Sequence, residues 1–459
     1  MNDNKLLYDT HENPKTVKEW LLYAIQMLMA VFVATVLISN ICGTPVDAGL
    51  LGACLGTLTY QVITRFKSPI FISNSGATVS AVIGALLLST GVDKIGIPGV
   101  NYNYFAVFIG GLVVLAVYSI FAFVIKWRGI EALNKLFPPY IVGPITIVIG
   151  LNLAGFILTY VGLNNFNSLI HNPLDIQWWI PTLVAIATML VIALTSHYFK
   201  GFLKTIPFLI GLVFGLIVCL VLELTIPNLA FGQFPDGSPA KIIELLGNIN
   251  GLFRLPDFTF LHWSIEGFTF TTLLDILLLF TPVAICALCE HYSDHAVMSN
   301  IIGHDLTKNP GLHKTLLGDG VASAIGTIVG GQPNTSYGES TAMVGFSRVA
   351  SVKVVSLAAI MMGLLAFVEP VQVLISAIPN CVFGGCAMIL YGYIACSGIK
   401  TLMKNKVDLE DNKKLIITSV ILTVGVSGIF LFSQSFAGVS LAMILGVILN
   451  LILKSKKVE

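Results

Sequence analysis

The sequence predicts an all-α membrane protein with 14 transmembrane segments, arranged as two inverted 7-span repeats. Three observations support this fold class. Hydrophobic residues make up 56% of the 459-residue chain, charged residues only 11%, and the mean hydropathy is +0.88. Soluble globular proteins carry about 25% charged residues, so this composition indicates a lipid environment. Apolar runs of spanning length recur along the chain, and its basic residues gather on one predicted side.

A helix needs about 20 apolar residues to cross the hydrocarbon. On this criterion we predict crossings centred near residues 30, 56, 82, 114, 150, 188, 214, 280, 323, 342, 360, 385, 423 and 444. The third crossing follows the polar residues 73–76, and the short tenth opens with residues 330–339. The twelfth is split at Pro379 and Asn380.

Charge sets the predicted orientation. If the N-terminus is cytoplasmic, every Lys and Arg except Lys94, Lys241 and Arg254 falls on the cytoplasmic side, as the positive-inside rule requires. A wrong span count would destroy this asymmetry, so we expect a multi-pass protein of the cell (inner) membrane with both termini cytoplasmic. The segment up to Trp20 is polar and lacks the pattern of a cleavable signal peptide.

The longest polar connection, residues 227–262, separates seven spans from seven. An odd number of spans reverses the orientation of the second half, which is the inverted-repeat plan of many secondary transporters. Spans three and ten then correspond, and both are broken by small and polar residues. Irregular backbone at membrane depth needs protein or a cavity to satisfy it, so such a pair indicates a binding site. Simple kinks or loops are the alternative.

Acidic residues in spans cost about 2.5–3.5 kcal/mol each on insertion scales and need a reason to be there. Five stand out: Asp275, Glu290, Asp294, Asp319 and Glu339. Asp275 lies near the outer start of span eight. Asp319 lies near the inner start of span nine, where a helix N-terminus favours a carboxylate. For these two we favour a structural role.

Glu290 and Asp294 are four residues apart, so they share one face of a helix. Two carboxylates this close in a low dielectric do not both ionise, and at least one then holds a proton near neutral pH. A proton-coupled site requires that property. The alternative is that this segment is the hydrated cytoplasmic end of span eight.

Glu339 lies in the broken tenth segment, where Pro333 and Gly338 leave backbone groups free. A carboxylate beside free amides suits a small planar ligand whose edge alternates N–H and C=O groups, as in a nucleobase. Tyr337 and Phe71 either stack on such a ring or pack in the core.

The sequence contains no catalytic, phosphate-binding or metal-ligating pattern. Cys286 and Cys289 have CxxC spacing, but on a spanning helix they are interpreted as packing residues. The net charge of +1 gives no indication of nucleic acid. We therefore expect no enzyme activity, no metal and no cofactor other than the proton as coupling ion.

The sequence resembles the uracil permease branch of the nucleobase–ascorbate transporter family over roughly residues 20 to 455. The strongest stretch is residues 333–339, followed by Arg348, Val349 and Ser351. The other stretches are Glu290-His291, Asp305-Leu306, residues 310–313, residues 137–139, Gly143-Pro144, residues 390–392 and residues 397–399.

The resemblance implies a core domain and a gate domain, with short extended strands that break spans 3 and 10. The implied segments are a cytoplasmic tail (1–18), the first core segment (19–136), the first gate segment (137–226), an extracellular or periplasmic connection (227–263), the second core segment (264–368) and the second gate segment (369–459).

The resemblance also implies the site. Glu290, Glu339, Gly338, Gly76 and Tyr337 are the implied substrate-binding residues. The implied proton-coupling residues are Glu290, Asp294 and His295. Three positions depart from the family pattern: Asp294 replaces a histidine implicated in coupling, Gly76 a phenylalanine that contributes its amide, and Met27 a histidine that follows Gln26.

A transporter that takes up uracil with a proton is the function these features favour. A xanthine or mixed uracil–xanthine permease and an uncoupled nucleobase facilitator remain alternatives. An anion exchanger of the same architecture is disfavoured, because the predicted site carries acids and no Lys or Arg lies within the spans. The expected partners are uracil or a related nucleobase, protons and the lipid bilayer, with no nucleic acid; a homodimer is left open.

Overall fold

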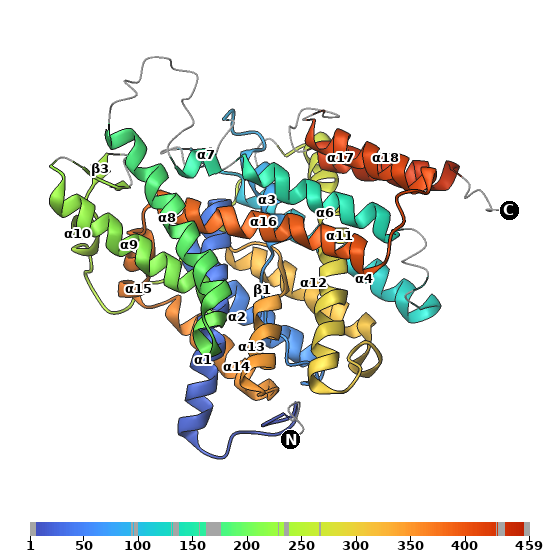
Figure 1. The fold of residues 1–459 in the computed structure, drawn as a ribbon, viewed down its shortest axis with the longest axis horizontal. Coiled ribbons are helices and arrows are strands. Elements are labelled where there is room, and N and C mark those ends of the chain that lie inside the picture. The colour runs from blue at the N-terminus through green and yellow to red at the C-terminus, as the bar shows by residue number, and fades with distance from the viewer. Residues whose placement is uncertain are drawn as a thin grey trace.

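The computed structural model describes residues 6–92, 95, 100–129, 131, 137–155, 157–161, 176–227, 229–233, 238–265, 268–427, 429 and 437–453. Lys94, which the predicted topology places outside, is not among the described residues, and neither is the start of the predicted N-terminal tail. Figure 1 shows the arrangement of the helices and strands.

Helices make up most of the first half of the chain. The elements are α1 (Val17–Cys42), α2 (Val46–Ile63), β1 (Ile72–Asn74), η1 (Gly76–Thr78), α3 (Val79–Leu87), α4 (Tyr104–Arg128), α6 (Pro139–Ala154), α7 (Ile157–Tyr160), α8 (Ile176–Tyr198), η2 (Gly201–Thr205) and α9 (Pro207–Thr225). The connection that follows contains β2 (Gly232–Gln233), β3 (Pro239–Ala240), α10 (Ile242–Leu246) and η3 (Thr259–His262).

The second half has the same character. Its elements are α11 (Phe270–Ile302), the π-helical turn η4 (Thr307–Gly311), α12 (Leu312–Val329), β4 (Asn334–Ser336), α13 (Gly338–Ser347), α14 (Val352–Leu365), α15 (Glu369–Ser376), α16 (Asn380–Lys404), α17 (Asn412–Val426) and α18 (Ala437–Ile452).

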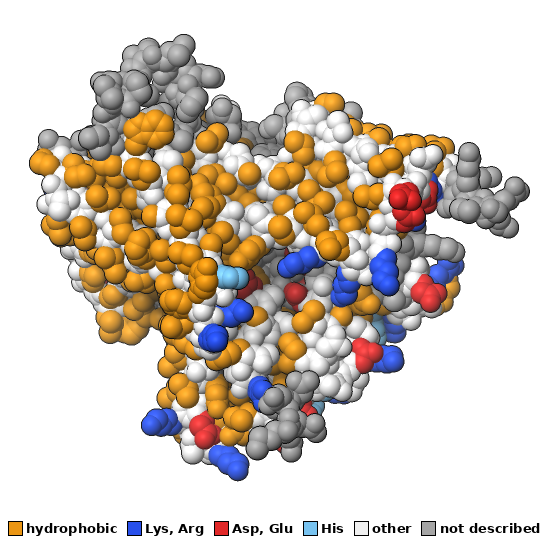
Figure 2. Space-filling model, viewed as in Figure 1, with side chains coloured by type: hydrophobic (Ala, Val, Ile, Leu, Met, Phe, Trp, Pro, Cys, Tyr) orange, Lys and Arg blue, Asp and Glu red, His pale blue; other side chains and the backbone are white. Residues whose placement is uncertain are grey.

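A helix lies at each of the fourteen centres predicted from the sequence. Within the described residues, seven helices are long and apolar enough to cross a membrane, and four shorter helices are also apolar. The chain is therefore a multi-pass membrane protein. Figure 2 agrees with this: hydrophobic side chains cover the upper and left regions of the visible face, and charged side chains gather around a central hollow and toward the lower end.

The helices pack as two groups. In the first helix group, α1–α4 and α11–α14, α12 packs on α2 and α4, and α14 packs on α1 and α2. In the second helix group, α6, α8, α9 and α16–α18, α16 packs on α6 and α8, and α17 packs on α6 and α18. In Figure 1, α16 lies between α8 and α17, above α12, α13 and α14. Contacts such as α1 with α16 and α11 with α6 join the groups.

The two interrupted segments meet in the first helix group. Strands β1 and β4 pair antiparallel, with Ile72 opposite Ser336, Ser73 opposite Thr335 and Asn74 opposite Asn334. Each strand leads directly into a short helical segment, η1 followed by α3 in one case and α13 in the other. This two-stranded sheet is the irregular backbone that the sequence predicted at residues 73–76 and 330–339.

Side chains of the surrounding helices donate hydrogen bonds to backbone carbonyls of these strands. Thr57 of α2 donates to the carbonyl of Ile72 (2.7 Å), and Ser323 of α12 donates to the carbonyl of Asn334 (2.6 Å). Asn334 in turn donates from Nδ2 to the carbonyl of Gly52 (3.0 Å). A Cβ atom on Gly56 would come within 2.3 Å of that amide nitrogen, so glycine is required for this close approach. Buried strands therefore survive without water because neighbouring helices complete their hydrogen bonds.

Candidate functional site

Two cavities lie at the boundary between the helix groups. The first, of about 630 Å³, is lined by α11, α6 and α16 and contains Glu290. The second, of about 450 Å³, is lined by α1, α13, η2, α9 and α16 and contains Glu339. Each of these two acids projects from the first helix group toward the second. The boundary between the groups therefore holds two of the acids that the sequence singled out.

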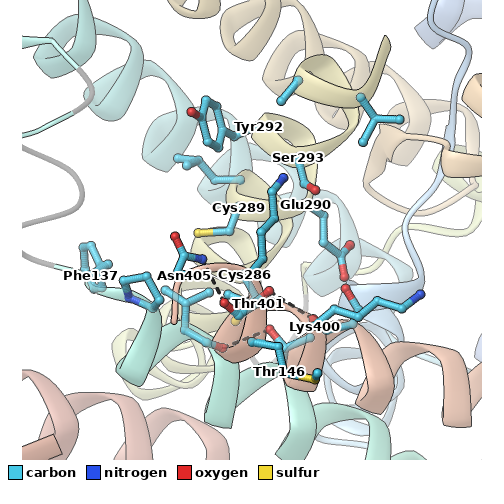
Figure 3. Close-up of a pocket in the computed structure, with 18 residues that line it drawn as sticks. Phe137, Thr146, Cys286, Cys289, Glu290, Tyr292, Ser293, Lys400, Thr401 and Asn405 are labelled. Carbon is cyan, nitrogen blue, oxygen red and sulfur yellow. Dashed lines mark hydrogen bonds between the residues drawn. The ribbon is translucent and has the colours of Figure 1, made fainter. Parts of the chain in front are cut away.

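Glu290 reaches the first cavity from the long helix α11. Thr269 caps the start of α11 by accepting a hydrogen bond from the amide of Thr272 (3.2 Å). The Glu290 side chain is half-buried, and Figure 3 shows it in the pocket with Thr146 of α6 and Thr401 of α16. A carboxylate in this position is accessible to a ligand in the cavity and is also shielded from bulk water.

Glu339 and Gly338 begin helix α13. No side chain caps this helix, so its first amides remain available to a ligand. Gly338 is exposed and Glu339 is half-buried. The N-terminus of α13 thus offers amide donors beside one carboxylate acceptor, the arrangement predicted for a planar ligand with alternating donor and acceptor groups.

Asp294 lies beside the other two acids. Ser336, the last residue of β4, donates from Oγ to Asp294 Oδ2 (2.8 Å), and a Cβ on Gly338 would lie 3.8 Å from Asp294 Oδ1. Glu290, Asp294 and Glu339 are close enough to interact electrostatically. The fold therefore brings together these three acids from two helices that are distant in sequence.

Tyr337 and Gly76 occupy different surroundings. Tyr337 is 5% exposed, and its hydroxyl donates to the carbonyl of Asn74 (2.9 Å), which ties the two broken segments together. Phe71 is fully buried, so its ring packs in the core. Gly76 is half-buried, and a Cβ there would meet only ordinary contacts with Ile394 (3.5 Å) and Ile38 (3.8 Å). The position therefore tolerates a Cβ atom.

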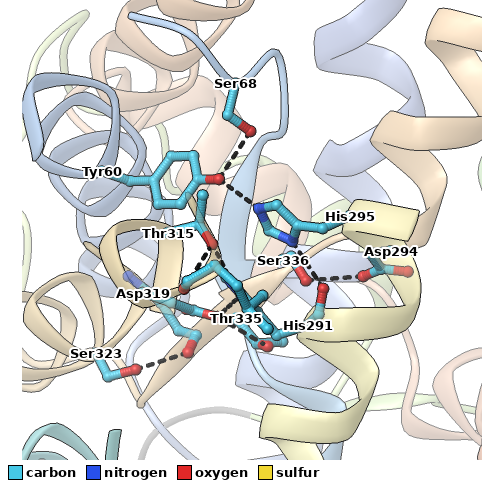
Figure 4. Close-up of polar contacts among 12 residues, drawn as sticks. Tyr60, Ser68, His291, Asp294, His295, Thr315, Asp319, Ser323, Thr335 and Ser336 are labelled. Atoms are coloured by element: carbon cyan, nitrogen blue, oxygen red, sulfur yellow. Dashed lines mark hydrogen bonds and ion pairs between the residues drawn. The ribbon is translucent and has the colours of Figure 1, made fainter. Parts of the chain in front are cut away.

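His295 is fully buried and points away from the acids. Its Nε2 lies 2.6 Å from the hydroxyl of Tyr60, and its Nδ1 donates to the carbonyl of His291 (2.7 Å). The Tyr60 hydroxyl also lies 2.8 Å from Ser68 Oγ. Figure 4 shows His295 directed toward Tyr60, whereas Asp294 on the same helix is directed toward Ser336.

Asp319 has a different environment from the one that the sequence suggested. Helix α12 begins at Leu312, so Asp319 lies well past the first turn and is not stabilised as a helix N-terminus. It is instead fully buried, and its Oδ2 lies 2.7 Å from Nδ1 of His291 (Figure 4). The explanation by the helix terminus was therefore wrong, because the helix extends further upstream than the sequence indicated.

The hydrogen bonds fix the proton count of this pair. Thr315 Oγ1 uses its one proton on the carbonyl of Leu312 (3.0 Å), so it accepts from His291 Nε2 (3.1 Å). The short contact between His291 Nδ1 and Asp319 then requires one further proton, held by either partner. The pair has no net charge in both arrangements. This buried pair joins α11 and α12. Asp319 also accepts a weaker hydrogen bond from Thr335 of β4 (3.5 Å).

This proton count predicts the effect of two substitutions. In Asp319→Asn, the amide donates to Nδ1 of a neutral His291, so thermal unfolding in detergent should change by only a few degrees. In Asp319→Ala, His291 and Thr335 lose their partner, and breaking a buried pair in this way typically costs about 3–5 kcal/mol. Asp319→Ala should therefore unfold at a much lower temperature, with Asp275→Ala as the control. Equal melting temperatures for the two Asp319 variants would show that the His291–Asp319 pair does not stabilise the contact between α11 and α12.

Three lysines that were not expected at the site from the sequence also line these cavities. Lys400 and Lys404 of α16 line the first cavity, and Lys204 of η2 lines the second. In the sequence they appear as ordinary basic residues at the cytoplasmic ends of spans. The signal that was available is their spacing: Lys400 and Lys404 are four residues apart and share the face of α16 that also presents Ser397.

Comparisons with known proteins place the chain in a family. A family model described as "Permease family" matches residues 18–434. The chain is 35% identical over 461 residues to the uracil permease of Bacillus caldolyticus, which covers 99% of this chain and 96% of the relative. It is 34% identical over 435 residues to the uracil permease of Escherichia coli K12, covering 94% and 90%. The chain belongs to this permease family, the one that its motifs resembled, whose members are transporters and not enzymes.

Solved structures support the fold at much lower sequence identity. The transmembrane domain of the cyanobacterial bicarbonate transporter BicA matches with a TM-score of 0.59 at 15% identity, covering 96% of this chain and 98% of that one. The murine Slc26a9 anion transporter matches with a TM-score of 0.63 at 11% identity, covering 96% and 69%. The chain therefore shares its overall fold with these anion transporters.

Proposed function

We propose that this protein takes up uracil together with a proton by alternating access. The observation that carries the proposal is the placement of Glu290 and Glu339 on cavities between the two helix groups. The names of its relatives support uracil as the substrate. The site can bind this neutral ligand by hydrogen bonds alone, because the N–H and C=O groups of uracil match a carboxylate and free amides.

In the proposed pose, uracil lies between the two cavities, where Glu339 accepts from a ring N–H and the exposed amide of Gly338 donates to a ring carbonyl. Protonated Glu290 donates to a second carbonyl, so that proton and substrate bind together. Asp294 shares protons with Glu290, since interacting carboxylates titrate as a unit. His295 is a weaker candidate for this role, because it is bonded to Tyr60 and His291 in the interior.

In this proposal the first helix group is the core domain (19–136 and 264–368) and the second is the gate domain (137–226 and 369–459). The antiparallel pairing of β1 with β4 supports an inverted repeat, because the two strands come from corresponding spans. The helix at every predicted centre supports fourteen crossings, and the distribution of Lys and Arg along the sequence supports cytoplasmic termini. The two cavities then open to the cytoplasm, where Lys204, Lys400 and Lys404 are also placed.

Mixed specificity is a second candidate that one observation favours. Gly76 has no side chain where the family pattern has a phenylalanine ring, and a bicyclic purine needs more space than uracil. Uptake of radiolabelled uracil into proteoliposomes distinguishes the two candidates, with xanthine, thymine and 5-fluorouracil as competitors. Competition by 5-fluorouracil and not by xanthine is expected for a uracil transporter. Equal competition by xanthine would favour the mixed permease, and no uracil uptake at all would reject both.

A further inference from the structure

Charges on the two cavities separate by helix group. In the first cavity the only charged lining residues among those described are Glu290 on one side and Lys400 and Lys404 on the other. In the second they are Glu339 and Lys204. The acids come from the first helix group, and the lysines come from α16 and η2, beside the second. Figure 2 shows both kinds of charge around the central hollow, and Figure 3 shows Lys400 in the same pocket as Glu290.

These lysines have no carboxylate partner within 4.0 Å in the described residues of the chain. Lys414, by comparison, pairs with Asp411 at 3.4 Å, and Lys308 pairs with Asp305 at 3.6 Å. Lys204, Lys400 and Lys404 are all exposed. Their ammonium groups are therefore free to act on whatever charge the cavity contains.

Other titratable groups lie on α11, on the elements packed against it and on the cavity wall. They include Asp275, Cys286, Cys289, His291, Tyr292, Asp294 and His295 on α11, Tyr104, Tyr118, Lys126 and Arg128 on α4, His313, Lys314 and Asp319 on α12, Glu339 on α13, Tyr140 on α6, Lys308 on η4, and Lys400 and Lys404 on α16. The helix α3 and the elements η1, β4 and α18 pack against α11 and carry no titratable side chain. Among the residues that line the cavity with Glu290, Lys400 and Lys404 are the ones that carry positive charge.

We propose that Lys400 is a positioning residue for proton release, acting on Glu290 across the boundary between the helix groups. This inference rests on the proposed uptake of uracil with a proton. An ammonium in the same cavity stabilises the ionised carboxylate and so favours loss of its proton. The effect reaches about one Debye length, roughly 8 Å at physiological salt.

The location of the lysines makes this effect conditional on conformation. Lys400 belongs to the second helix group and Glu290 to the first, so relative movement of the groups changes the distance between them. In the arrangement seen here the lysine and the acid line the same cavity, and proton release is favoured on this side. When the groups move and the cavity opens on the other side, Glu290 loses this positive neighbour and binds a proton more readily.

The test compares wild-type protein with Lys400→Gln in proteoliposomes at a fixed outside pH and a series of inside pH values. Without the ammonium, Glu290 retains its proton more strongly. Net uracil uptake should therefore stop at a higher inside pH. The inside pH that halves net uptake should therefore rise by about half a unit in Lys400→Gln. Exchange of internal for external uracil should show no such shift, because exchange returns the protonated carrier. Lys400→Arg should restore the wild-type midpoint.

Lys353→Gln is the control, since Lys353 is an exposed lysine at the start of α14 and outside both cavities. An unchanged midpoint in Lys400→Gln, or an equal shift in Lys353→Gln, would overturn the inference. Uptake by the wild-type protein distinguishes a wrong role for Lys400 from a wrong proposed function. If wild-type protein shows no gradient-driven uptake, the proposed function fails first.

Discussion

Glu290→Gln is expected to keep binding uracil and to lose accumulation driven by a proton gradient, with net uptake falling at least tenfold. Glutamine resembles the protonated acid, so it still donates to a ring carbonyl, but it cannot release a proton. Exchange of internal for external uracil should persist, because exchange requires no net proton movement. The measurement combines uracil binding to the purified variant with gradient-driven uptake in liposomes.

Asp275→Asn is the matched control for this experiment, because Asp275 is half-buried on the same helix and outside both cavities. It should accumulate uracil like the wild-type protein. If Glu290→Gln still accumulates uracil under a proton gradient, Glu290 is not the proton carrier. The role would then pass to Asp294, which is bonded to Ser336 next to the same cavities.

Glu339→Gln is expected to weaken uracil binding about tenfold or more. A hydrogen bond to a charged group contributes about 1.5–3 kcal/mol, and a loss of about 1.4 kcal/mol corresponds to a factor of ten in affinity. The variant keeps an acceptor at the start of α13 but loses its charge. Calorimetry or scintillation binding on the purified protein measures the change.

Glu410→Gln serves as the control for Glu339→Gln, because Glu410 is exposed, close to α17, and lines neither cavity. Its affinity for uracil should match that of the wild-type protein. Wild-type affinity in Glu339→Gln would remove Glu339 from the pocket. It would also leave the amides of α13 without the carboxylate on which the proposed pose depends.

Much of the fold could be predicted because hydropathy, charge and breaks in the pattern are local signals. Apolar runs located a helix at every predicted centre, and the small polar residues 73–76 and 330–339 marked strands β1 and β4. The proximity of Glu290 and Asp294 was also predictable, because these two acids are one helical turn apart. Glu339 lies in a broken segment that needs polar surroundings, and only the family resemblance placed it at the same site.

The remainder depends on contacts between distant regions of the chain. The pairing of His291 with Asp319 joins two helices, and no spacing rule indicates it. The Tyr337 hydroxyl bonds to Asn74 only because β1 and β4 pair. Lys400 appeared as a cytoplasmic charge because it lies near the polar end of α16, and only the cavity that α16 and α11 line together connects it with Glu290.

Whether uracil and a proton move together can be measured in liposomes. Purified protein in liposomes, with the outside more acidic than the inside, takes up radiolabelled uracil with and without a protonophore. The account predicts that internal uracil rises above the external concentration and that the protonophore abolishes this accumulation. If internal uracil only reaches the external concentration, at the same rate with and without the gradient, transport is not coupled to protons. The protein is then an uncoupled facilitator.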